Sequence, residues 1–149
     1  MSKIGVVYVL TYGGDVLLML RDNNPNINLP VRWELPARAL EGGDSPAESA
    51  QRGLMIEFGL RDVPLTEIGT SPKGHVFFYA ELESSHVPKR GLGQAFAHGF
   101  FSTEAIEEFY SLGVGGKGQL GGVLTTFVKE NFAEFRKLIK EGVFPTGAF

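Results

Sequence analysis

Few residue types in this chain could build a conventional catalytic centre. Its 149 residues include no cysteine, which excludes a thiolate metal site and a cysteine nucleophile. His75, His86 and His98 are scattered and lack the spacing of metal ligands, so we interpret each as a surface or hydrogen-bonded residue. Lys117 follows a glycine, but Gly118 stands where a phosphate-binding loop needs serine or threonine. Arginines, carboxylates and aromatic rings are the remaining candidates.

Aromatic rings and arginine planes can stack on nucleotide bases. Candidates to line such a nucleotide pocket are Arg21, Trp33, Phe78 and Phe96. Most of the 12 phenylalanines must be core residues, so a purely structural role competes with this interpretation for each phenylalanine.

The composition narrows the class of protein. With 43% hydrophobic residues the chain can bury a core, and its length suits one domain, which we expect to span residues 1–149. A net charge of −3 excludes a strongly basic nucleic-acid binder. No apolar run reaches the roughly 18 residues of a membrane span, and residues 4–10 lack the flanks of a signal peptide. We therefore expect a cytoplasmic protein.

The clearest element is a helix that begins after Ser45. Serine is a preferred N-cap, Pro46 suits the first helical position, and Glu48 completes a capping box. Gly59 supplies the C-terminal stop. Apolar side chains recur between these ends at helical spacing, at Ala47, Ala50, Leu54 and Phe58.

Strand-like segments surround this helix. The apolar residues 4–12 and 16–20 flank a glycine-rich turn, which predicts a hairpin. Further expected elements are short extended pieces over 32–40, strands at 65–70, 75–82 and 96–101, helices over 102–110 and 123–140, and loops at 21–30 and 111–122. The order of these elements predicts an α+β domain with a sheet between helices.

The stretch from Trp33 to Leu60, WELPARALEGGDSPAESAQRGLMIEFGL, resembles the Nudix box of Nudix hydrolases. That motif is a glycine, five residues, a glutamate, seven residues, then Arg-Glu-apolar-any-Glu-Glu-any-Gly-apolar. The resemblance extends over residues 4 to 135. It implies an α/β/α sandwich with a mixed sheet, and Mg²⁺- or Mn²⁺-dependent cleavage of nucleoside diphosphates linked to another group. It also strengthens the case for Trp33, which immediately precedes the box.

The box itself, Arg38 to Leu60, departs from the motif. Arg52, Glu57 and the closing glycine-leucine pair are retained. Four positions differ, with Arg38 replacing the first glycine, Asp44 the first glutamate, Gly53 the glutamate after the arginine, and Ile56 the first of the paired glutamates.

These departures weaken the metal site that the resemblance implies. Helix positions 53, 56 and 57 share one face, and the family places three carboxylates there. Only Glu57 remains, and a single carboxylate binds Mg²⁺ weakly because the ion gives up its water reluctantly. Carried over residue by residue, the resemblance gives Asp44, Arg52 and Glu57 as catalytic residues, with Asp44 and Glu57 as weak metal ligands.

Each charged candidate also has a second interpretation. Arg38 could hold phosphate in place of a metal ion, or be a solvated loop residue paired with Glu41 or Asp44. Glu57 could be a metal ligand, or form a salt bridge to Arg52 or a lysine. Asp44 could accept a proton or orient Arg52, or simply favour the start of the helix.

Three functions follow as hypotheses. The first is a degenerate Nudix domain that binds a nucleotide or another diphosphate-containing small molecule, with weak or absent hydrolysis and no required metal. The second is an active Mg²⁺- or Mn²⁺-dependent pyrophosphohydrolase whose metal is held by Asp44, Glu57, Glu41 and backbone carbonyls. The third is a protein-interaction domain that uses the phenylalanine-rich last helix and tail. The sequence leaves open whether the chain forms a homodimer.

Overall fold

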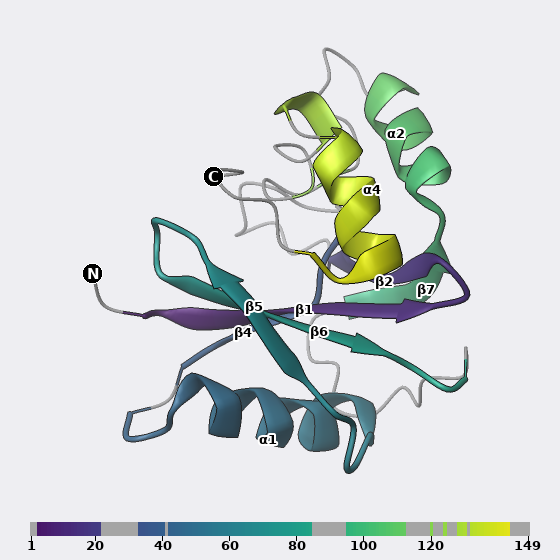
Figure 1. Ribbon diagram of the computed structural model, residues 1–149. Helices are drawn as coiled ribbons and strands as arrows, with labels where there is room; N and C mark the ends of the chain where they lie inside the picture. Colours follow the sequence, from purple (N-terminus) through teal and green to yellow (C-terminus); the bar gives the residue numbers. More distant parts are fainter. Residues whose placement is uncertain are drawn as a thin grey trace.

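The computed structural model describes residues 3–21, 33–40, 42–84, 95–112, 120, 124, 128–130 and 132–143. These residues form a mixed seven-stranded sheet with helix α1 on one face and helices α2 and α4 on the other (Figure 1). The elements are β1 (Gly5–Tyr12), β2 (Asp15–Arg21), β3 (Trp33–Glu34), β4 (Ala37–Ala39), α1 (Pro46–Phe58), β5 (Thr66–Thr70), β6 (His75–Glu81), β7 (Ala95–Phe101), α2 (Thr103–Leu112) and α4 (Phe132–Glu141). None of the described helices is long and apolar enough to cross a membrane.

Strand β1 is the centre of the sheet. It pairs antiparallel with β2 through the predicted hairpin, whose turn glycines Gly13 and Gly14 have φ angles of 60° and 86°. It also pairs parallel with β6 and antiparallel with β4. The remaining pairs are antiparallel, and they join β7 and β3 to β2 and β5 to β6.

Alternation along the strands divides the core into two layers. Val6, Tyr8 and Leu10 of β1 pack against α1, while Val7 and Val9 pack against the opposite helices. The α1 layer also contains Leu17, Ala50, Leu54, Phe58, Val76, Phe78, Ala80 and Leu82. The other layer contains Val16, Leu18, Leu35, Phe77, Ile106, Leu120, Leu124, Val128, Phe135, Leu138 and Ile139.

The capping signals of α1 are confirmed. The Ser45 hydroxyl accepts from the Glu48 backbone N–H at 3.2 Å, and the Glu48 carboxylate accepts from the Ser45 N–H at 3.1 Å. Gly59 ends the helix in the left-handed region, with φ of 68°. The expected strands and the helix after Ser102 are also present, and the Ser102 hydroxyl accepts from the Ala105 N–H at 3.0 Å.

Two sequence expectations fall mainly outside the described residues. These are the loop at 21–30 and the glycine-rich segment 111–122. The last predicted helix is seen as α4, with further helical residues at 124 and 128–130. The apolar stripe of this helix faces the core, because Phe135, Leu138 and Ile139 are at most 1% exposed. These three residues offer no surface to a partner. Phe132 is only partly buried and the tail after residue 143 lies outside the described residues, so the interaction hypothesis stays a prediction.

Candidate functional site

Arg38 projects from β4 across the surface of α1. Arg38 pairs with Val6 of β1, whose side chain lies in the α1 layer, so the Arg38 side chain points to the same face of the sheet. A methyl group built on Gly53 of α1 would lie 2.5 Å from Arg38 Cδ and 2.9 Å from Arg38 Nη1. The arginine stem therefore crosses the helix at Gly53, and the solvated-loop interpretation of Arg38 is wrong: its Nε and Nη1 atoms are buried.

Tyr8 lies on the other side of the space above Gly53. Its hydroxyl donates to the Ala50 carbonyl of α1 at 2.9 Å, and it would lie 2.3 Å from a methyl group on Gly53. The ring is fully buried and meets Phe58 edge-on at 6.2 Å. Burial raises the pKa of the Tyr8 phenol well above its usual range, so the group stays a neutral hydrogen-bond donor. Sequence inspection gave no role to Tyr8 beyond that of a strand residue.

Glu57 lies one helical turn beyond Gly53, on the same face of α1. Its side chain is half-buried, and burial raises its carboxyl pKa above the ordinary value of 4.5. The Arg38 guanidinium opposes this shift, because a nearby positive charge favours the ionised carboxylate. Arg38 and Glu57 therefore interact electrostatically at the edge between β4 and α1.

Asp44 and Arg52 form a separate ion pair. Arg52 Nη1 contacts Asp44 Oδ2, and Nη2 donates to Oδ1 at 3.3 Å, so both ends of the guanidinium fork are engaged. Asp44 thus orients Arg52, one of the three roles expected for it. Asp44 precedes the first turn of α1, whereas Glu57 lies in the last turn.

The separation of these carboxylates corrects the expected metal site. From Pro46 to Glu57 the helix advances by about 16 Å at 1.5 Å per residue. Ligands of one Mg²⁺ ion each lie about 2.1 Å from it. Asp44 and Glu57 therefore cannot share an ion, and the hydrolase hypothesis loses its proposed ligand pair. Glu41, the third carboxylate of that hypothesis, lies outside the described residues.

The residues of the α1 face do not fit a divalent metal ion. Gly53 has no side chain, Ile56 is 51% exposed and apolar, and a permanent cation lies beside Glu57. In the described part of the chain, no three histidine, aspartate or glutamate side chains gather to hold an ion. A divalent ion would meet one half-buried carboxylate and a neighbouring positive charge, which is a poor donor set.

Trp33 and Phe78, two of the four expected nucleotide-pocket residues, do not come together. Trp33 packs with the α2 and α4 layer, where its ring meets Phe101 edge-on at 4.7 Å. Phe78 lies in the opposite layer against α1 and is only 2% exposed. The prediction that both line one pocket is wrong, because the sheet separates them. Arg21 is the last residue of β2 and Phe96 lies in β7, but their side chains are outside the described part of the structure.

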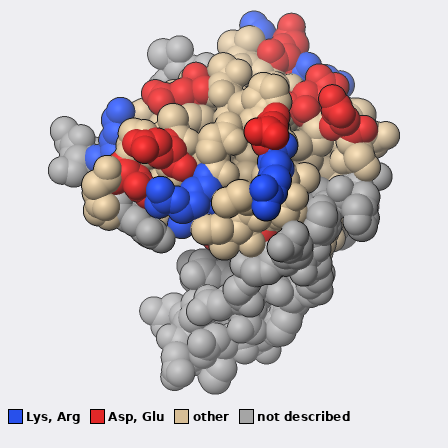
Figure 2. All heavy atoms as spheres, turned by 90° about the horizontal axis from the view of Figure 1, so that it is seen from below, with Lys and Arg blue, Asp and Glu red and all other residues tan. Residues whose placement is uncertain are grey.

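The outer surface on the α1 side carries interspersed acidic and basic side chains (Figure 2). A hollow of about 330 Å³ lies beside the exposed edge of α1, and its lining is Gln51, Arg52, Met55, Leu60, Arg61 and Asp62. Another hollow of about 380 Å³ adjoins it across the Leu60–Asp62 segment. Neither hollow includes Arg38 or Glu57.

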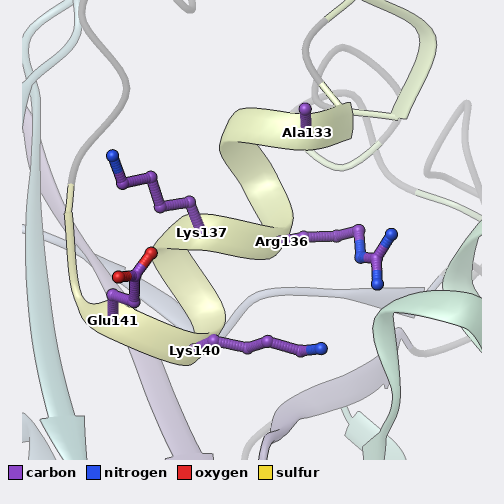
Figure 3. Close-up of a pocket in the computed structure, with 5 residues that line it drawn as sticks. All are labelled: Ala133, Arg136, Lys137, Lys140 and Glu141. Atoms are coloured by element: carbon purple, nitrogen blue, oxygen red, sulfur yellow. The ribbon is translucent and has the colours of Figure 1, made fainter.

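A further hollow, of about 370 Å³, lies on α4 across the sheet from Glu57. Arg136 and Lys140 extend to one side of the helix, and Lys137 and Glu141 to the other (Figure 3). Arg136 already has two partners. It forms an ion pair with Glu104 of α2 at 3.3 Å, and its guanidinium carbon lies 5.8 Å from the Phe132 ring centre. This surface is a solvated helix face, separate from the candidate site.

Solved structures share this arrangement of elements. A MutT protein from Methanosarcina mazei Go1 matches with a TM-score of 0.65 and 17% identity, over 91% of this chain and 96% of its own. A MutT/Nudix family protein from Listeria innocua gives 0.60 and 20%, over 92% and 97%. A Nudix hydrolase from Nitrosomonas europaea gives 0.59 and 15%, over 100% and 96%. This chain has the Nudix fold.

The Nudix fold confirms the expected sandwich of a mixed sheet between helices. The resemblance of Arg38 to Leu60 to a Nudix box maps onto β4, α1 and the start of the next connection. No protein-family model matches the chain, and no curated protein matches its sequence. Identities this low establish the Nudix fold alone, so the function must be argued from the site.

Proposed function

We propose that this Nudix-fold chain binds a nucleotide or another diphosphate-containing small molecule and hydrolyses it weakly or not at all. The observation that carries the proposal is the α1 face itself. Arg38 lies over Gly53, beside the single carboxylate Glu57, in the region where the Nudix box would gather carboxylates.

The chemistry of this face favours binding over turnover. A guanidinium carries a permanent positive charge, which attracts phosphate oxygens. It cannot ionise a bound water as a divalent metal does. Glu57 could act as a general base, but a base alone contributes about 10²- to 10⁴-fold, far below a complete hydrolytic site.

A second candidate function is protein interaction or self-association through α1. Met55 and Ile56 are adjacent apolar residues on its outer surface and are 41% and 51% exposed. Met55 also lines the hollow at Arg52 and Arg61. This candidate moves the interaction surface from the last helix, where Phe135, Leu138 and Ile139 are buried, to α1. Size-exclusion chromatography of Ile56→Ser against the parent protein tests it, and an unchanged elution volume with a monomeric parent would exclude self-association.

The proposal is tested by screening one compound panel for both binding and turnover. The panel contains nucleoside triphosphates, oxidised nucleotides, dinucleotide polyphosphates, ADP-ribose and nucleotide sugars, each with Mg²⁺, Mn²⁺ or EDTA. A ligand present at 100 times its Kd stabilises the folded state by about 2.7 kcal/mol. For a chain of this length, that corresponds to a rise in Tm of about 5–10 °C.

We expect such a rise for at least one compound class, with no metal-dependent phosphate release. Glu57→Gln is the control for turnover. Metal-dependent release that disappears in Glu57→Gln would favour the hydrolase alternative and refute the proposal. A panel that produces neither a shift in Tm nor phosphate release would refute binding and leave the interaction candidate.

A further inference from the structure

Two departures from the Nudix box prove to be one packed unit. In the sequence, Arg38 and Gly53 look like independent losses, one of a glycine and one of a glutamate. In the structure they are in contact, because the space where a side chain of residue 53 would begin is filled by the Arg38 stem and the Tyr8 hydroxyl. Even a methyl group would come within 2.3 Å of Tyr8 Oη and 2.5 Å of Arg38 Cδ.

The exchange is therefore complementary in volume and in charge. The box motif places a small residue in the loop and a carboxylate on the helix. This chain has a large residue in the strand and no side chain on the helix, so the strand residue occupies the space that a helix side chain would need. The motif's metal ion provides positive charge beside the second of the paired glutamates, and here a guanidinium provides it beside Glu57.

We propose that Arg38 is a built-in cation that replaces the divalent metal of a Nudix site, held in place by Gly53, Tyr8 and Glu57. Gly53 leaves room for the Arg38 stem because it has no side chain. Tyr8 borders this space, and its hydroxyl is held by the hydrogen bond that it donates to the Ala50 carbonyl. Glu57 balances the guanidinium charge. These three are positioning residues, and Arg38 supplies the positive charge that would attract a phosphate group to this face.

The consequence for ligand recognition rests on the proposed function. A diphosphate held by a guanidinium needs no divalent ion, so chelators should leave its affinity unchanged. The same guanidinium repels a second cation and fills the space that metal ligands would need. The site should therefore discriminate against Mg²⁺ and Mn²⁺, in contrast to a carboxylate cluster.

The first experiment measures metal binding alone, with Mn²⁺ as a paramagnetic probe. The parent protein is compared with the triple variant Arg38→Gly, Gly53→Glu, Ile56→Glu, which restores the motif's carboxylates beside Glu57. The triple variant is made in a Tyr8→Phe background, because the Tyr8 hydroxyl would obstruct a side chain at residue 53. We expect weak Mn²⁺ binding in the parent and binding tighter by about tenfold or more in the triple variant. Mn²⁺ bound by the parent and lost in Glu57→Gln would overturn the inference, as would a folded triple variant that gains no Mn²⁺ affinity.

The second experiment measures inorganic pyrophosphate binding by calorimetry with and without EDTA. Arg38→Met keeps an apolar stem over Gly53 and removes the charge, which guards against simple unfolding. Arg61→Ala, an exposed arginine at the end of α1, is the matched control. We expect EDTA to have no effect, Arg38→Met to weaken binding by about 10- to 100-fold, and Arg61→Ala to leave it unchanged.

The two experiments distinguish failure of the proposed function from failure of the built-in cation. If the parent protein binds neither pyrophosphate nor any compound of the panel, the proposed function fails, but the Mn²⁺ comparison still decides whether Arg38 occupies the place of the metal. If pyrophosphate binds and EDTA abolishes that binding, the proposed function stands and the built-in cation is refuted. Equal losses in Arg38→Met and Arg61→Ala would refute a specific role for Arg38.

Discussion

Gly53→Ala gives the most direct test of the packing at the site. In an ordinary helix interior this substitution stabilises a protein by about 0.5–1 kcal/mol, because alanine loses less conformational entropy on folding than glycine. Here the new methyl group would meet Tyr8 Oη at 2.3 Å and Arg38 Cδ at 2.5 Å. Contacts this short require one of these groups to move.

Neither group can move without cost. The Tyr8 ring is fully buried, and shifting it breaks the hydrogen bond to the Ala50 carbonyl, which costs about 1–3 kcal/mol when a buried partner is left unsatisfied. Displacing the Arg38 stem is overpacking, which costs about 1–3 kcal/mol. We therefore expect a net loss of about 1–3 kcal/mol, or a fall in Tm of about 3–10 °C for a chain of this length.

The sign of the effect should depend on the two neighbours. In a Tyr8→Phe, Arg38→Ala background, the atoms that obstruct the methyl group are gone. Gly53→Ala should then be neutral, or stabilising by up to about 1 kcal/mol. The measurement is urea unfolding followed by far-UV circular dichroism, with the four proteins compared in one buffer. Stabilisation of the parent protein by Gly53→Ala would refute the packed unit, and so would destabilisation of equal size in both backgrounds.

The remaining predictions concern the helix cap and the half-buried carboxylate. Ser45→Ala removes one half of the capping box and should lower the free energy of unfolding by about 1 kcal/mol, measured in the same urea series; no change would mean that the cap contributes nothing. Glu57 has a folded-state pKa above 4.5, so the folded protein binds its proton more tightly than the unfolded chain does. Its contribution to stability should therefore fall as pH rises from 4.5 through the raised pKa, and Glu57→Gln should remove that part of the pH dependence in unfolding measured at pH 4.5 and pH 7. A parallel pH dependence in the parent and the variant would contradict the assigned shift.

Local signals in the sequence predicted much of the secondary structure. The start and end of α1 were predictable because capping depends on residues within one turn of the helix end, here Ser45, Glu48 and Gly59. The hairpin was predictable because the turn glycines separate two apolar runs. The sandwich architecture followed from the Nudix-box resemblance and is confirmed by the fold.

The site depended on contacts that no local pattern encodes. Tyr8, Arg38 and Gly53 are far apart in the chain, and only the pairing of β1 with β4 and the packing of α1 on the sheet bring them together. In the sequence, Gly53 therefore looked like the loss of a carboxylate. In the structure, the missing side chain leaves the space that the Arg38 stem occupies. The sequence did contain a signal, because Arg38 and Gly53 are both unusual residues for a Nudix box. Their contact could not be derived from their spacing along the chain.

Tertiary structure also decided which expected partners are separated. Asp44 and Glu57 both belong to the box, yet the rise of α1 places them at opposite ends of one rigid helix. Trp33 and Phe78 were both expected in one pocket, yet they lie on opposite faces of the sheet. The sequence by itself determined the elements, their caps and the residue types available for chemistry. The assignment of those residues to common or separate sites came only from the packing of sheet against helix, because it depends on distances through space between residues that are remote along the chain.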